Sequence, residues 1–154
     1  MKNSLLLLLS IFFFSCQQKQ NKDTEVKHSE PIVKKKNQEE NKLIGDTLFM
    51  NFKDKKGFFV GNASLDSIHP RIYVKFKNEA IGELNATIIT PTRTGNIRFN
   101  QIVFPDNTSN GPFGMDLKIK LTQKGNHILV IGHSLMADNP FWGKFKVQIE
   151  NKKD

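Results

Sequence analysis

The chain has 154 residues, which is the length of one ordinary domain of about 100 to 150 residues plus an additional segment. Its formal net charge is +8, and its positive side chains are dispersed without the aromatic-and-arginine platform of nucleic-acid binders, so the composition argues against a nucleic-acid partner. A positive surface of this kind favours an anionic membrane or glycan. The single cysteine, Cys16, excludes an intrachain disulfide and a cysteine-based metal site.

Residues 1–16 have the pattern of a secretory signal peptide. A positive charge at Lys2 precedes an apolar run of ten residues that starts at Leu5. This length fits a signal core of about 7 to 15 residues and is shorter than the roughly 20 residues of a membrane-spanning helix. The run ends at Ser15-Cys16, and a small residue directly before a cysteine resembles the lipobox of bacterial lipoproteins. The resemblance implies cleavage before Cys16, lipidation of that residue and stable anchoring in a membrane through several acyl chains.

Residues 17–42 are expected to form a disordered tether. They consist mainly of Gln, Asn, Lys, Glu and Ser, and their sizeable apolar side chains are Val26, Ile32 and Val33. A segment of this composition buries too little apolar surface to offset the entropy of ordering. The alternating charges from Lys34 to Glu40 are more typical of a solvated linker than of a lipid-binding patch.

Residues 43–154 contain short runs of alternating apolar and polar side chains, separated by turn residues about every eight to twelve positions. This spacing is typical of a β-sandwich or barrel. We predict an all-β domain, an antiparallel eight-stranded β-sandwich without a substantial helix. The predicted strands are Thr47 to Phe52, Phe58 to Leu65, Arg71 to Lys77, Glu83 to Thr90, Asn96 to Phe104, Met115 to Leu121, His127 to Gly132 and Lys144 to Glu150.

The alternation also assigns faces to the predicted strands. Ile72, Val74 and Phe76 point to one side, whereas Arg71 and Tyr73 point to the other. The run from His127 to Ile131 is apolar at nearly every position, which is expected of a central strand covered on both sides or of a strand near a buried edge.

If successive strands simply reverse direction, three loops share one end of the domain, namely Asn78 to Gly82, Pro105 to Gly114 and Ser134 to Gly143. Binding residues concentrate on loops that a rigid scaffold holds, and Trp with neighbouring carboxylates and amides suits a sugar ring or a protein partner. The candidate binding residues are Asp106, Asn107, Asn110, Asp138, Asn139, Phe141 and Trp142. Alternatively, the apolar side chains of the third loop fold back and close the end of the sandwich; these are Leu135, Met136, Phe141 and Trp142.

No residue pattern indicates catalysis or a metal. The histidines at 69, 127 and 133 are scattered, no calcium-loop spacing surrounds the aspartates, and no serine has a G-x-S-x-G context. We therefore predict a non-enzymatic protein without metal or cofactor.

The C-terminal part of the chain resembles the β-sandwich shared by bacterial pre-peptidase C-terminal domains and periplasmic inhibitors of invertebrate-type lysozyme. The resemblance lies in the strand that ends at Leu121, the glycine turn at Gly125 and the strand from Gly143 to Ile149. It implies a jelly-roll-like sandwich with a ligand or protein partner at a loop end. The inhibitors insert a Ser-Gly-x-Tyr loop into the lysozyme cleft, whereas this chain has Lys124 to His127 there, so only the glycine matches.

Two functions follow as expectations, and a third alternative, a hydrolase, would need clustered carboxylates in a pocket. The first is a lipid-anchored binding module of the outer membrane that faces the periplasm and engages an envelope glycan or protein. The second is an inhibitor of a lysozyme-like cell-wall hydrolase, which would be lost on changing Lys124 or His127.

Overall fold

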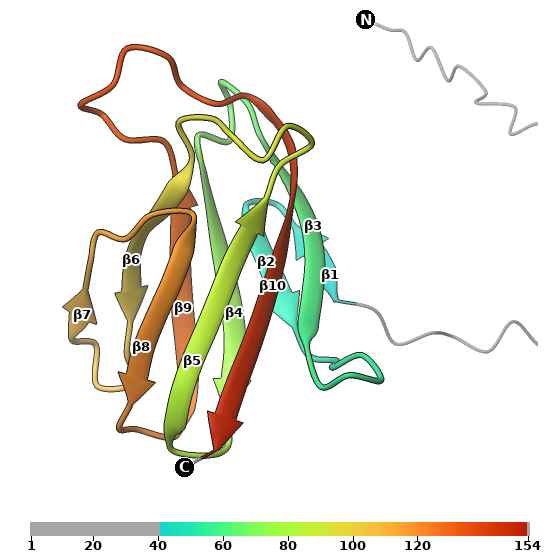
Figure 1. Ribbon diagram of the computed structural model, residues 1–154, viewed down its shortest axis with the longest axis vertical. Helices are drawn as coiled ribbons and strands as arrows, with labels where there is room; N and C mark the ends of the chain where they lie inside the picture. Colours follow the sequence, from blue (N-terminus) through green and yellow to red (C-terminus); the bar gives the residue numbers. More distant parts are fainter. Residues whose placement is uncertain (1–40, 154) are drawn as a thin grey trace, which may run out of the picture. The chain divides into compact units, whose positions relative to one another are not determined.

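The computed structural model of the chain describes residues 41–153 (Figure 1). The expected signal peptide, Cys16 and residues 17–40 of the expected tether lie outside the described residues. Asn41, which was expected in the tether, contacts the domain, because its amide donates hydrogen bonds to the carbonyls of Phe52 and Val60. No helix long and apolar enough to cross a bilayer occurs between residues 41 and 153.

The described part is all-β, as predicted, and forms a six-stranded and a four-stranded sheet. Its ten strands are β1 (Lys42–Ile44), β2 (Thr47–Met50), β3 (Phe59–Leu65), β4 (Arg71–Asn78), β5 (Gly82–Ile89), β6 (Arg98–Val103), β7 (Ser109–Asn110), β8 (Asp116–Leu121), β9 (Gly125–Gly132) and β10 (Gly143–Lys153). The larger sheet has the order β1-β2-β4-β9-β6-β7, and the smaller one has the order β3-β10-β5-β8. The β-sandwich prediction is confirmed, with ten strands in place of eight.

The two strands that the sequence did not predict are β1 and β7. They contain three and two residues, which is too short for side-chain alternation to be recognised. Both exist because they pair with a longer neighbour. Strand β1 pairs with β2 through a tight turn in which Gly45 has a φ of 60°, and β7 pairs with β6 at Ile102–Asn110 and Val103–Ser109.

Strand directions depend on the short strand β7. The chain passes between the two sheets at almost every connection. Between β2 and β4 it runs through β3 of the other sheet and reverses twice, so β2 and β4 run in the same direction. They pair in parallel, unlike the antiparallel pairing that was predicted. Strand β9 is nevertheless antiparallel to both β4 and β6, because the chain reverses once more at β7. After β7, Phe113 donates to the Phe99 carbonyl of β6, and Met115 then accepts from Ile88 of β5 in the other sheet.

The core lies between the two sheets. Strand β9 lies between β4 and β6, so of the two positions that the sequence allowed, it has the central one. Its inward side chains Leu129 and Ile131 have no exposed surface, and burial of each such side chain contributes about 1.5 to 3 kcal/mol. The outward face of the six-stranded sheet, by contrast, is polar along β4 and β6.

Candidate functional site

The residues that the sequence grouped into one binding surface lie at opposite ends of the sandwich. Asp106 accepts a hydrogen bond from Gln123 at 2.6 Å, just before β9 begins, whereas the Trp142 ring contacts the His133 ring just after β9 ends. The eight residues of β9 span roughly 23 Å at about 3.3 Å per residue. The prediction that these loops form one binding surface is therefore wrong, because the segment from residue 105 to 115 runs from one end of the sandwich to the other.

Asp106 and Asn107 form a turn. The Asp106 carboxylate accepts hydrogen bonds from the hydroxyl and the backbone N–H of Thr108, at 2.6 and 3.0 Å. These hydrogen bonds and the one from Gln123 lower the pKa of the Asp106 carboxyl group. Asn107 has a φ of 66°, which is a turn conformation that asparagine tolerates. The hydrogen bonds of Asp106 and Asn107 stabilise the turn between β6 and β7.

The loop between β9 and β10 divides into an inward and an outward part. Phe141 packs against the core, close to Gly95, which agrees with the plug alternative. Leu135 and Met136 are 80% and 96% exposed, and Trp142 is 46% exposed, so these three side chains do not close the sandwich. Asp138 and Asn139 of the same loop are exposed and make no side-chain hydrogen bond to residues 41–153.

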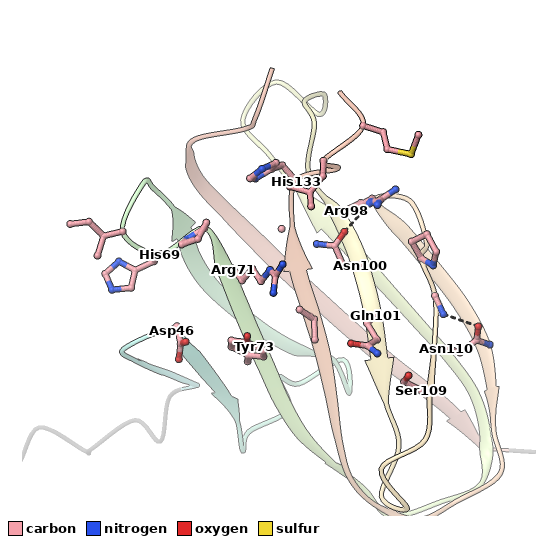
Figure 2. Close-up of a pocket in the computed structure, with 18 residues that line it drawn as sticks. Asp46, His69, Arg71, Tyr73, Arg98, Asn100, Gln101, Ser109, Asn110 and His133 are labelled. Atoms are coloured by element: carbon pink, nitrogen blue, oxygen red, sulfur yellow. Dashed lines mark hydrogen bonds between the residues drawn. The ribbon is translucent and has the colours of Figure 1, made fainter. Parts of the chain in front are cut away.

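A groove of about 830 Å³ lies on the outward face of the six-stranded sheet (Figure 2). Strands β4, β9, β6 and β7 form its floor, and the β3–β4 and β9–β10 loops form its walls. Of the predicted binding residues, Asn110 lines the groove. The full lining is Asp46, Ile68, His69, Pro70, Arg71, Tyr73, Arg98, Asn100, Gln101, Ser109, Asn110, Gly111, Pro112, Val130, Gly132, His133, Leu135 and Met136.

Strand pairing arranges the floor of the groove in rows. Tyr73 and Gln101 both pair with Val130, so their side chains lie on either side of β9. Arg71 and Arg98 both pair with Gly132 in the next outward row. A bulge in β6 between Phe99 and Gln101 adds Asn100 to the outward face beside these rows.

Short hydrogen-bond networks stabilise the two loops that form the walls of the groove. In the β3–β4 loop, the Asp66 carboxylate accepts from the backbone N–H groups of Ile68 and His69 at 2.9 and 2.6 Å. The hydrogen bond from His69 is the main reason why the pKa of Asp66 is lowered. The β9–β10 loop is fixed by Asn96, whose amide both donates to the carbonyl of Ser134 and accepts from its backbone N–H, at 3.1 and 2.8 Å.

Sequence reasoning missed Arg71, Tyr73, Arg98 and Gln101 as site residues. The alternation along β4 had placed Arg71 and Tyr73 on the outward face, which was a usable signal. Nothing in the sequence indicated that β6 lies two strands away and presents Arg98 at the same level. The role of Asn96 as a loop clamp had no sequence signal either.

The polar groups that line the groove are guanidinium, amide, hydroxyl and phenol groups, together with the Asp46 carboxylate and the imidazoles of His69 and His133. Within residues 41–153, no cluster of three or more His, Cys, Asp or Glu side chains is arranged to hold a metal ion. The turn that was aligned with the inhibitor loop places His127 in the interior with no exposed surface. Contact with a lysozyme cleft would therefore depend on Lys124 and Asn126, which are exposed.

Comparison with protein-family models finds no family that matches this chain, and a search of curated proteins finds no match. The assignment of function therefore depends on the fold and on the geometry of the groove.

Proposed function

We propose that the chain is a lipid-anchored, non-enzymatic binding protein of the bacterial cell envelope, and that it binds an envelope glycan in the groove of the six-stranded sheet. The observation that supports this proposal most is the groove itself. Its volume of about 830 Å³ lies within the roughly 300 to 1,000 Å³ that is usual for small-ligand sites. The residues of its floor come from four strands of one sheet, which suits a preformed site.

The lining favours a glycan because it offers planar polar groups beside an aromatic ring. The Tyr73 ring provides an apolar face for a sugar ring together with a hydroxyl group that can stay in contact with water. The amides of Gln101 and Asn110 both donate and accept, as pairs of sugar hydroxyl groups require. Ser109 adds a hydroxyl group at the edge of the sheet. The four residues occupy three strands, so the contacts extend across the groove.

The anchor is proposed from the sequence. Lipidation at Cys16 would hold the protein on the outer membrane, and residues 17–40 would give the domain reach into the periplasm. Replacing Cys16 with Ser is expected to abolish incorporation of radiolabelled palmitate and to release the protein from the membrane fraction. Equal labelling of the C16S variant would contradict the lipoprotein proposal and leave the groove proposal intact.

The glycan proposal is tested by isothermal titration calorimetry with a panel of peptidoglycan fragments and neutral and acidic oligosaccharides. Tyr73→Ala and Gln101→Ala are each expected to weaken binding by about tenfold, the equivalent of one hydrogen bond or ring contact. Gln148→Ala is the matched control, because Gln148 is a half-buried glutamine on β10 of the other sheet. Binding by no member of the panel, or equal losses in the two glutamine variants, would overturn the proposal.

A protein partner is the second candidate, and the rim of the groove favours it. Ile68, Leu135 and Met136 are at least 80% exposed and lie on the two loops that form the walls. Large exposed apolar side chains grouped around a polar groove are typical of interaction surfaces. Replacing all three with Ser would abolish binding of a purified envelope protein and leave oligosaccharide affinity unchanged if this candidate is correct.

A further inference from the structure

One end of the groove contains two arginines at the same level of the sheet. Arg71 on β4 and Arg98 on β6 both pair with Gly132 of β9, which lies between them. Neighbouring strands are about 4.8 Å apart, so the two arginine Cα atoms are separated by roughly 10 Å. Because Gly132 has no side chain, the Asn100 side chain can lie over the backbone between the two arginines.

Asn100 lies over this floor and orients Arg98. Its amide oxygen accepts a hydrogen bond of 2.8 Å from Nε of Arg98, which leaves both terminal nitrogens of that guanidinium group available. Its Nδ2 lies 2.8 Å from the place that a Cβ atom on Gly132 would occupy. In the described part of the chain, this Nδ2 makes no hydrogen bond, so the Asn100 amide that covers Gly132 has a free donor.

Neither arginine is neutralised by an acidic residue. In residues 41–153, the strand lysines Lys77, Lys118 and Lys152 have carboxylate partners, whereas no ion pair includes Arg71 or Arg98. Of the described residues that line the groove, Asp46 is the one carboxylate, and it accepts a hydrogen bond from Thr47. The end of the groove therefore has two permanent positive charges without an internal counter-charge.

We propose that Arg71, Arg98 and Asn100 form a subsite for an oxyanion, either a carboxylate or a phosphate group of the ligand, above Gly132. The inference rests on the proposed function and makes the envelope glycan an acidic one. Guanidinium groups bind planar carboxylate and phosphate oxygens through paired N–H donors. A bound anion also relieves the repulsion between the two arginines, so binding should be stronger here than at a single exposed cation.

The test uses NMR titration of the ¹⁵N-labelled full chain in nonionic detergent, with inorganic phosphate, galacturonate and galactose as separate probes. Phosphate or galacturonate is expected to shift the Gly132 amide and the Nε signals of Arg71 and Arg98, whereas uncharged galactose is expected not to do so. The response to phosphate compared with that to galacturonate identifies which anion the subsite prefers.

Arg71→Gln and Arg98→Gln are each expected to weaken anion binding by at least about tenfold, which is the usual effect of a charged hydrogen bond. Lys75→Gln is the matched control, since it removes one positive charge from the exposed outward face of β4 without altering the groove lining. Gly132→Ala is a second variant that fills the subsite, because its Cβ would displace the Asn100 amide.

The inference is overturned if galactose shifts the same signals as the anions, if no probe shifts the Gly132 amide, or if R71Q and K75Q lose the same affinity. Its failure is distinguishable from failure of the glycan proposal. Oligosaccharide binding that depends on Tyr73 but not on Arg71 would retain the function and refute the anion subsite. Anion binding at Arg71 without any oligosaccharide binding would retain the anion subsite and refute the glycan proposal.

Discussion

The interior histidine, His127, provides a pH-dependent test of the packing in the core. Its ring is stacked on Phe76 with ring centroids 5.5 Å apart and has an edge contact with Phe104 at 6.0 Å. Its Nδ1 lies 3.1 Å from the carbonyl oxygen of Gly125 and donates to it. The other ring nitrogen, Nε2, is buried and has no partner in the described residues, so protonation there would place a positive charge among aromatic rings.

Burial lowers the pKa of His127 below its ordinary value of 6.5, and the hydrogen bond to Gly125 opposes this effect only in part. The unfolded chain therefore binds a proton more readily than the folded one. The stability that depends on a neutral His127 is complete above pH 6.5 and is lost as the pH falls from there toward the folded pKa. The free energy of unfolding should decline by up to about 1.4 kcal/mol per pH unit in that interval.

The measurement is urea denaturation at several pH values between about 7.5 and 5.5, followed by circular dichroism rather than by Trp142, whose ring contacts His133. His127→Phe keeps an aromatic ring between the two phenylalanines and removes the titratable nitrogen. This variant is expected to show a clearly flatter pH dependence, whereas His69→Gln, which changes a surface histidine, should retain the decline. Parallel losses of stability in wild type and His127→Phe would refute the reasoning.

Three further predictions concern the fold. Leu129→Ala on the inward face of β9 should cost about 2 to 5 kcal/mol in urea denaturation, and Ile128→Ala on the outward face less than half of that; equal losses would contradict the assigned faces. Asn96→Ala removes the clamp on the β9–β10 loop, worth about 1 kcal/mol per hydrogen bond, and should accelerate amide exchange in that loop while exchange in the core strands is retained. Gly111→Ala should lower the melting temperature by several degrees, because Gly111 has a φ of 141° and its Cβ would lie 2.6 Å from a backbone oxygen, whereas Gly114→Ala, with no atom closer than 3.9 Å, should have little effect.

The sequence was sufficient to predict the sandwich because a period of two is a local property. In β4 and β10, apolar side chains at alternate positions are buried and their neighbours face outward, as predicted. The continuous apolar run of β9 likewise agrees with its central place in the larger sheet. These features depend on the partition of side chains between core and water, which each strand displays by itself.

The position of the candidate site could not be predicted in the same way. Counting reversals from strand to strand grouped Asp106 with Trp142, and the count failed at Ser109–Asn110. Those two residues are polar and exposed, so nothing in their side chains indicates a strand. They form a strand only because they pair with β6, and the reversal at this pairing changes the direction of every strand that follows.

The sequence by itself therefore determined the fold class, the inward and outward faces of the strands and the expectation of an acylated cysteine. The tertiary structure decided which outward residues are neighbours. Arg71 and Arg98 belong to different strands and share no sequence pattern, yet hydrogen bonding of both strands to β9 places them on either side of Gly132. Such proximity arises from long-range strand register, which has no local signature in the residues themselves.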